Sequence, residues 1–153
     1  MSVYLVQHGI SLKKDVDPER GLSEEGIAEV ERIAAVAKNY EVTVSRIEHS
    51  GKKRARQTAE IIAFALIPGQ MSEARDGLNP LDDVAAIARR LHSADNLMLV
   101  GHLPFMERLT AYLITGSMER TVFRFQNGGI LCMDQDPDAC TWHIKWTLMP
   151  HIG

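Results

Sequence analysis

The sequence VYLVQHG at residues 3–9 decides the expected fold, because it places a histidine and a glycine directly after an apolar run. Four consecutive apolar residues that include two valines are typical of a short strand buried on both faces of a parallel sheet. In open α/β sheets, ligands bind in the crevice beyond the carboxyl ends of the strands. His8 therefore lies where chemistry is expected.

A second segment, LMLVGHLP at residues 97–104, repeats this pattern of an apolar run followed by a histidine. The run ends at Gly101, His102 follows, and Pro104 suits the first position of a helix. If both runs are strands of one parallel sheet, the two histidines can face the same crevice. The pair formed by His8 and His102 is the main candidate for a functional site.

Length and composition indicate one globular domain, and we expect it to span residues 1–153. Hydrophobic residues make up 45% of the chain, which can fill one core without help from disulfides or a metal. The net charge of −3 gives no general reason to expect a nucleic acid or a membrane as partner. We also expect a cytoplasmic protein, because no apolar run resembles a signal segment or approaches the roughly 18 residues of a membrane span.

Helices and strands are expected to alternate through the first three quarters of the chain. Ser23 can cap a helix whose first turn holds two glutamates, and Asp82 or Asp83 can cap a later one. The expected elements are a strand at 3–7, a helix at 23–38, a strand at 44–49, a helix at 50–66, a loop at 68–80, a helix after 82–83, a strand at 96–101 and a helix at 104–116.

The last part of the chain changes to the pattern of antiparallel strands. Apolar residues at 122–125 precede the turn signal NGG at 127–129, and the apolar segment 130–133 follows, which predicts a hairpin. Residues 142–148 alternate between apolar and polar side chains, as in a half-buried strand. The whole pattern predicts a three-layer α/β/α sandwich with a mostly parallel sheet and an antiparallel edge.

The predicted helix after Ser50 begins with a concentration of positive charge. Lys52, Lys53, Arg54 and Arg56 lie in its first turns, where the helix dipole disfavours exposed cations by roughly 0.3 to 1 kcal/mol each. Free backbone N–H groups and guanidinium donors at a helix N-terminus can converge on one phosphate. The alternative is a basic face that only contacts solvent.

Four segments resemble, in order and spacing, the motifs of the histidine phosphatase superfamily, also called phosphoglycerate mutase-like. They are QHG at 7–9, GLSEEG at 21–26, SGKKRARQTA at 50–59 and GH at 101–102. The short chain and its Gly-His-Leu-Pro segment are similar to the SixA-type phosphohistidine phosphatase branch. The resemblance implies the phosphoglycerate mutase-like fold and a hydrolase that needs neither a metal nor another cofactor.

The resemblance also implies a role for each matching residue. His8 would attack phosphorus and carry the phosphoryl group as a covalent intermediate, which splits one displacement into two easier steps. Arg54 and His102 would bind the phosphoryl oxygens and stabilise their charge in the transition state. The implied substrate-binding residues are Gln7, Gly9, Ser11 and Ser50.

Gln7 departs from the family pattern, because the residue before the nucleophile is usually arginine. A neutral amide replaces a positive charge and a bidentate donor, and loss of one such donor typically costs on the order of 10²- to 10³-fold in rate. A slower enzyme and a non-catalytic module that binds phosphate or a phosphoprotein are both compatible with this residue. Replacement charges could come from Lys52, Lys53, Arg56 or Arg75.

The nature of the substrate depends on whether a general acid is present. A phosphate ester needs one for its leaving alkoxide, and the resemblance implies a carboxylate from the segment between the two histidines. Candidates are Glu73, Asp76, Asp82 and Asp83, of which the two last also suit helix caps. Phosphohistidine relaxes this requirement, because protonated imidazole is a good leaving group.

The segment between residues 58 and 96 leaves no room for a subdomain that would cover the crevice, so the site should be open. An open site can admit a side chain carried on a folded protein. We therefore expect a phosphorylated protein, such as a histidine phosphotransfer domain, as the substrate. A small phosphomonoester is the alternative among enzyme substrates.

Overall fold

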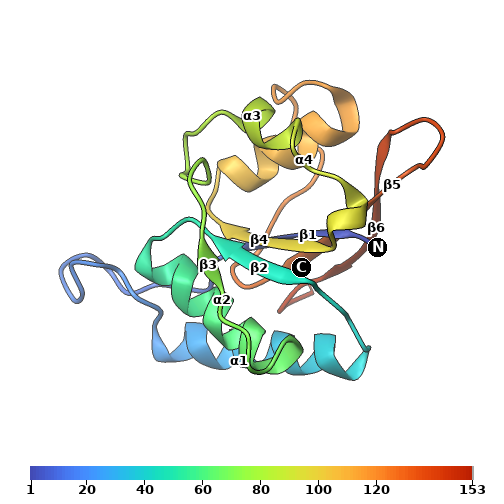
Figure 1. Ribbon diagram of the computed structural model, residues 1–153. Coiled ribbons are helices and arrows are strands. Elements are labelled where there is room, and N and C mark those ends of the chain that lie inside the picture. Colours follow the sequence, from blue (N-terminus) through green and yellow to red (C-terminus); the bar gives the residue numbers. More distant parts are fainter. Residues whose placement is uncertain (153) are drawn as a thin grey trace.

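The computed structural model describes residues 1–152 and has a six-stranded sheet at its centre, with the strand order β3-β2-β4-β1-β5-β6 (Figure 1). The strands are β1 (Val3–Gln7), β2 (Arg46–His49), β3 (Glu73–Ala74), β4 (Leu97–Gly101), β5 (Ile130–Gln135) and β6 (Trp142–Leu148). The helices are α1 (Glu24–Asn39), α2 (Lys53–Leu66), α3 (Val84–Ala88) and α4 (Phe105–Thr115), with a short 3₁₀ helix η1 (Ser93–Asp95). None of these helices is long and apolar enough to cross a membrane.

The central part of the sheet is parallel and its far edge is antiparallel, as the sequence predicts. β1 pairs in parallel with β4, and β2 pairs in parallel with both β4 and β3. β5 runs antiparallel to β1 and carries β6 antiparallel on its other side. The register sets Gln7 opposite Gly101, so the two histidines that follow emerge side by side from the same edge.

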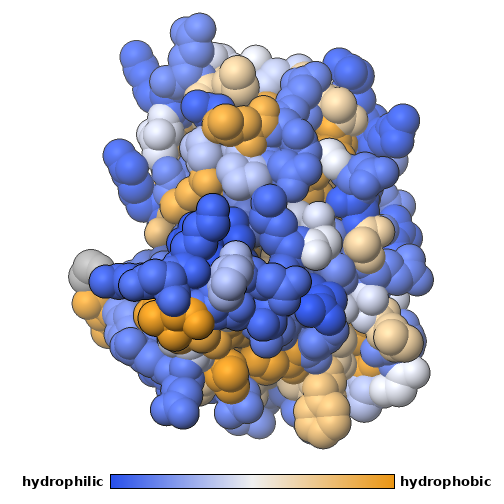
Figure 2. Space-filling view, turned by 90° about the vertical axis from the view of Figure 1, so that its left-hand side faces the viewer, coloured by the Kyte–Doolittle hydropathy of each residue, from blue (hydrophilic) through white to orange (hydrophobic). Residues whose placement is uncertain are grey.

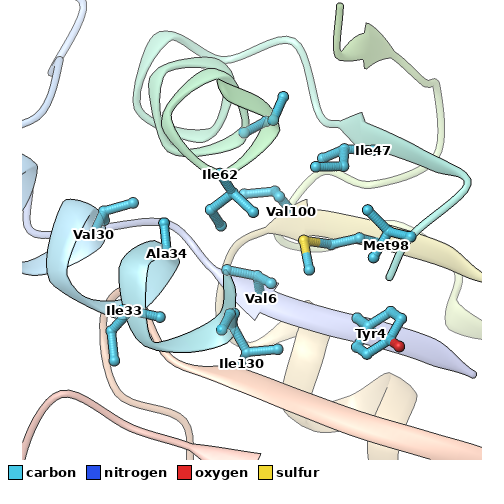
Figure 3. Close-up of a cluster of buried hydrophobic side chains, with 14 of the residues drawn as sticks. Tyr4, Val6, Val30, Ile33, Ala34, Ile47, Ile62, Met98, Val100 and Ile130 are labelled. Atoms are coloured by element: carbon cyan, nitrogen blue, oxygen red, sulfur yellow. The ribbon is translucent and has the colours of Figure 1, made fainter. Parts of the chain in front are cut away.

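Two apolar clusters, one on each face of the sheet, hold the layers together. β1 is buried along its whole length, with alternate side chains facing opposite layers. On one face, α1 and α2 pack against strand residues that include Tyr4 and Val6 (Figure 3). On the other face, α3 and α4 pack against residues that include Val3 and Leu5. The structure is therefore the expected three-layer α/β/α sandwich.

The prediction of a hairpin around residues 127–129 is wrong. Residues 121–127 form no strand, and β5 pairs directly with β1 instead. The turn contacts the end of β1, since the Gly128 N–H donates to the carbonyl of Gln7 at 2.9 Å, and the Asn127 amide donates to the carbonyl of His8 at 3.0 Å. The turn therefore supports the end of β1 and connects no hairpin.

The segment 68–80, expected to be a loop, contains the two-residue strand β3. The Arg75 N–H continues this pairing by donating to the carbonyl of His49 at 2.8 Å. So short a strand has too few residues for a periodic pattern, which explains why the sequence did not reveal it. The strand at 44–49 begins two residues later than expected, at Arg46.

Candidate active site

The two strand-end histidines lie together, as the sequence predicts. Their ring centroids are 5.1 Å apart and the ring planes are inclined by 54°. The backbone N–H of His8 donates to the carbonyl of Gly101 at 2.9 Å, which extends the pairing of β1 and β4 by one residue. His8 is partly exposed, whereas His102 is buried. One ring is therefore open to a ligand and the other forms the wall beside it.

The surroundings of His8 suit a neutral, nucleophilic imidazole. Its Nδ1 is 2.7 Å from the carbonyl oxygen of Gly9, and a carbonyl can only accept, so the proton lies on Nδ1. The lone pair is then on Nε2. Burial lowers the pKa of His8 to about 4, against the effect of the Gly9 bond and with help from the charges of Arg54 and Arg20. His8 is consequently neutral at neutral pH, with its single ring proton on Nδ1.

His102 is held by a hydrogen bond to Ser50. The distance between His102 Nε2 and Ser50 Oγ is 2.6 Å, and Ser50 lies between β2 and α2. Burial lowers the pKa of His102 to about 3, and the protonated form of His8 and the charge of Arg54 act in the same direction. The other ring nitrogen, Nδ1, is buried without a hydrogen-bond partner among the described residues.

Arg54, the second residue of α2, is a cation without an acidic partner. No carboxylate of residues 1–152 lies within 4.0 Å of its guanidinium, and burial, followed by the charge of Arg20, lowers its pKa. The start of α2 is tied to the end of β1 through Thr58. The Thr58 hydroxyl donates to the Arg54 carbonyl at 2.8 Å and accepts from the Gly9 N–H at 3.0 Å. Arg54 is thus positioned beside the histidines and free to bind an anion.

The other cations proposed to replace the missing arginine are mostly engaged elsewhere. Lys53 forms an ion pair with Asp17 at 2.9 Å, Arg56 with Glu60 at 3.9 Å and Arg75 with Glu48 at 2.7 Å. Lys52 is exposed, and its charge contributes to lowering the pKa of His102.

Arg20 is the charged residue near the site that sequence reasoning missed. Its charge contributes to the lowered pKa values of His8, His102 and Arg54. The signal was present in the sequence, because Arg20 directly precedes the motif GLSEEG at 21–26 and lies in the loop that follows β1.

The residues expected to bind substrate differ in what they contact. The Gln7 side chain is buried and its Oε1 has no hydrogen-bond partner in the described chain. Gly9 leaves no room for a side chain, since a Cβ there would lie 2.7 Å from Cγ2 of Val30. Ser11 forms an isolated bridge with Leu22 at the base of the loop that follows β1.

Asp82 and Asp83, two of the four candidates for a general acid, both serve as local caps. Asp83 is the N-cap of α3 and accepts from the Ala85 N–H at 3.0 Å. Asp82 accepts from the Asn79 N–H at 2.8 Å. Neither is recorded in a hydrogen bond or ion pair with the two histidines or Arg54. The structure thus shows what holds these carboxylates but gives them no contact with the site.

The molecular face onto which β1 and β4 end is mostly hydrophilic (Figure 2). Among the described residues, no three His, Cys, Asp or Glu side chains are grouped so as to hold a metal ion. The groups that converge are two neutral imidazoles, a free guanidinium and a helix N-terminus. Such a set can attack an electrophilic phosphorus and stabilise the charge on its oxygens.

Solved structures with this fold support the same interpretation. The protein histidine phosphatase SixA complexed with tungstate is 26% identical, with a TM-score of 0.83 over 98% of this chain and 97% of that one. A protein from Agrobacterium tumefaciens assigned to SixA is also 26% identical, with a TM-score of 0.75 and 97% of each chain covered. The alpha-ribazole phosphatase from Shigella flexneri, at 16% identity, shares the fold with a TM-score of 0.77 over 100% and 98% of the two chains. No protein-family model and no curated protein matches the sequence.

In fold, the chain is similar to members of the histidine phosphatase superfamily, and its histidine pair fits a phosphatase site. Within that superfamily the chain is similar to the SixA-type phosphohistidine phosphatases, over nearly its full length.

Proposed function

We propose that this protein is a phosphohistidine phosphatase that acts on phosphorylated proteins through a covalent intermediate on His8. The observation that carries the proposal is the state of His8. Its Nδ1 is bonded to the Gly9 carbonyl, its Nε2 lone pair is free, and the buried ring of His102 lies 5.1 Å away between centroids. A neutral imidazole with a fixed tautomer is the form that can attack phosphorus.

The reaction has two displacements. In the first, His8 Nε2 forms a bond to phosphorus while the bond from phosphorus to the substrate imidazole breaks, and that imidazole leaves with the proton it already carries. In the second, water attacks the phosphorus on His8, the bond between phosphorus and Nε2 breaks, and inorganic phosphate is released with His8 neutral again. Arg54 donates to the phosphoryl oxygens in both steps, where it stabilises their charge.

His102 has the second role in this mechanism. When its Nε2 carries the proton, the ring can donate either to Ser50 or to a phosphoryl oxygen. The short hydrogen bond to Ser50 fixes the orientation of the ring in the free protein. Because burial keeps His102 neutral in the free protein, a bound phosphoryl dianion receives a neutral donor there and a charged donor from Arg54. Ser50 therefore acts as a positioning residue.

The choice of phosphohistidine over an ester rests on the leaving group. Asp82 and Asp83 are held as local caps, so neither of these two carboxylates is positioned to protonate an alkoxide. Phosphohistidine does not need that proton, because its imidazole leaves in a protonated form. The similarity to proteins named as protein histidine phosphatases points the same way.

Gln7 supports a second candidate function, a module that binds phosphate or a phosphoprotein without turnover. Its neutral, buried side chain cannot supply the charge that an arginine would add. The two functions differ in one property only, which is whether the bound phosphoryl group is released as phosphate.

Phosphate release from a phosphohistidine-bearing protein and from an aryl phosphate tests the proposal. Wild type is compared with His8→Ala, with Gln7→Arg and with His143→Ala as a control, since His143 is exposed on β6. We expect release that requires His8, is unchanged in the control, favours the phosphohistidine protein and rises in Gln7→Arg. Wild-type release no faster than that of His8→Ala, with phosphate still bound, would establish the binding module instead.

A further inference from the structure

The loop between β1 and α1 is closed on itself by backbone hydrogen bonds. The Leu12 N–H donates to the Gly21 carbonyl at 2.8 Å, and the Ser23 N–H donates to the Ile10 carbonyl at 3.0 Å. The bridge between Ser11 and Leu22 joins the same two chain segments. Figure 1 shows this loop projecting at the left of the molecule, beside the first turns of α2. The loop therefore has a fixed base next to the site.

Two side chains of α2, those of Lys53 and Gln57, hold this loop in place. Lys53 forms an ion pair with Asp17 at 2.9 Å, and the same carboxylate accepts from the Gly21 N–H at 2.9 Å. The Leu22 N–H donates to Gln57 Oε1 at 2.7 Å. The chain runs so close to the helix that a Cβ on Gly21 would lie 2.8 Å from Cε of Lys53. The residue before Gly21 is consequently carried next to the helix start that holds Arg54.

That residue is Arg20, and its backbone conformation is unusual for an arginine. Its φ is +53°, in the left-handed region that favours glycine, and its N–H donates to the Asp17 carbonyl at 2.9 Å. A non-glycine residue in this region costs of order 1 kcal/mol and is worth a functional explanation. The side chain is exposed and forms no ion pair with a carboxylate of residues 1–152. Arg20 is thus a second unpaired guanidinium at the edge of the site.

Electrostatics supports this placement, because the positive charge of Arg20 lowers the pKa values of His8, His102 and Arg54 alike. Only a cation near all three groups has this effect. Two unpaired guanidinium groups that border one crevice repel each other, and a bound dianion removes that repulsion.

We propose that Arg20 binds the phosphoryl oxygens of the substrate from the solvent side and supplies the guanidinium that Gln7 does not. This inference rests on the proposed function, since it assigns a further substrate-binding residue to the same site. The phosphoryl group is then held between Arg54 from α2 and Arg20 from the loop, with charge-assisted hydrogen bonds from both. Asp17 is a positioning residue, because it accepts from Gly21 and pairs with Lys53 to fix the loop.

The test compares Arg20→Ala, Arg20→Lys and Arg20→Gly with Lys14→Ala, a matched control that removes an exposed cation from the same loop. Two quantities are measured for each: kcat/KM for phosphate release, and the affinity for tungstate by isothermal titration calorimetry. We expect Arg20→Ala to lose roughly 10- to 100-fold in both, less than a buried donor would, and Lys14→Ala to stay within about twofold. Arg20→Lys should be intermediate, because it keeps the charge without the bidentate donor.

Arg20→Gly separates binding from folding. Glycine accepts the positive φ, so this variant should unfold at the same or a higher temperature than wild type while losing as much tungstate affinity as Arg20→Ala. Adding Gln7→Arg to Arg20→Ala should restore most of the loss. If Arg20→Ala matches Lys14→Ala, or if Arg20→Gly binds tungstate as wild type does, the inference is wrong.

The tungstate measurement also distinguishes the two proposals. A wild type without His8-dependent phosphate release would overturn the proposed function, yet a loss of tungstate affinity in Arg20→Ala would still uphold the role of Arg20. Conversely, if wild type released phosphate in a His8-dependent way and Arg20→Ala behaved like wild type, the proposed function would be upheld and the role of Arg20 would be wrong.

Discussion

Helices α1 and α2 lie side by side on one face of the sheet, but they begin in opposite ways. α1 has a serine cap, Ser23, which accepts from the Gly26 N–H at 3.0 Å, and two glutamates in its first turn. α2 has Lys52 at its N-cap, with no side-chain cap hydrogen bond, and no acidic residue in its first turn. The first arrangement complements the helix dipole and the second opposes it.

Under the proposed function, the start of α1 serves the fold and the start of α2 serves the site. At the start of α1, the Ser23 hydroxyl accepts the Gly26 N–H and two glutamates complement the helix dipole. The start of α2 leaves N–H groups and the Arg54 guanidinium for an anion, next to His8 and His102. A change at the start of α1 should therefore alter stability, whereas a change at the start of α2 should alter activity.

The largest expected effect is that of Arg54→Ala, compared with Glu25→Ala at the equivalent second position of α1. Loss of a charged donor to the phosphoryl oxygens should lower kcat/KM by about 10²- to 10³-fold. The free energy of unfolding should stay the same or rise by up to about 1 kcal/mol, because a cation leaves the helix N-terminus. Steady-state kinetics and urea unfolding of both variants measure the two effects.

Glu25→Ala should show the reverse, with unchanged kcat/KM and a loss of about 0.3 to 1 kcal/mol in stability. If Arg54→Ala lowered stability while leaving kcat/KM unchanged, the two helix starts would have the same structural role and the comparison would fail.

Gly26→Ala tests the packing at the start of α1 and should have the next largest effect. A Cβ at this position would collide with the backbone carbonyl of Ile10, which cannot move aside as a side chain does. We expect a loss of about 1 to 3 kcal/mol in the free energy of unfolding, as for an overpacked core. Stability within 0.5 kcal/mol of wild type, measured by chemical unfolding, would show that the loop does not need this close approach.

The neutral histidines beside α2 should make stability depend on pH. An unfolded histidine has a pKa near 6.5, while burial lowers the pKa of His102 to about 3 and that of His8 to about 4 in the folded protein. Between about pH 6.5 and pH 4 the unfolded chain binds more protons, so the free energy of unfolding falls as the pH is lowered through this window.

In His102→Asn, the fall in the free energy of unfolding between pH 6.5 and pH 5 should be smaller than in wild type by about 1 to 2 kcal/mol. His143→Asn, which changes an exposed histidine, should keep the wild-type dependence. Urea unfolding at several pH values provides the measurement. The same slope in His102→Asn and wild type would mean that His102 is not held neutral by burial.

The smallest effects concern the caps themselves. Ser23→Ala should lower the free energy of unfolding by about 1 kcal/mol and leave kcat/KM within about twofold. Lys52→Ser places a capping hydroxyl at the N-cap of α2, whose backbone is already extended, and should stabilise the protein by up to about 1 kcal/mol. Thermal unfolding detects both changes. If Lys52→Ser lowered the unfolding temperature, the missing side-chain cap would not be what limits the stability of α2.

The sequence predicted the parallel core and the histidine pair because both depend on local patterns. An apolar run that ends in a histidine occurs twice, and parallel pairing of such runs brings His8 and His102 together. The charges at the start of α2, which are adjacent in the chain, also led to the prediction of an anion site, and this part stays a prediction.

The parts that the sequence did not predict depend on contacts between distant segments. The turn at 127–129 has the composition of a hairpin, but its donors bond to the carbonyls at the end of β1. Arg20 lies beside the start of α2 because the ion pair between Asp17 and Lys53 and the hydrogen bond from the Leu22 N–H to Gln57 hold its loop there. Its position before the motif at 21–26 can be read from the sequence, but these bonds between distant segments cannot.

Covalent labelling of His8 tests whether this residue carries the phosphoryl group during turnover. Wild type, His8→Ala and Arg54→Ala are mixed with a protein that carries radiolabelled phosphohistidine, quenched within milliseconds in alkali, and digested for mass spectrometry. Our account predicts an alkali-stable, acid-labile phosphoryl group on the His8 peptide of wild type, none on His8→Ala, and slower labelling of Arg54→Ala. Turnover by wild type with no label on His8, or with the label on another residue, would contradict it.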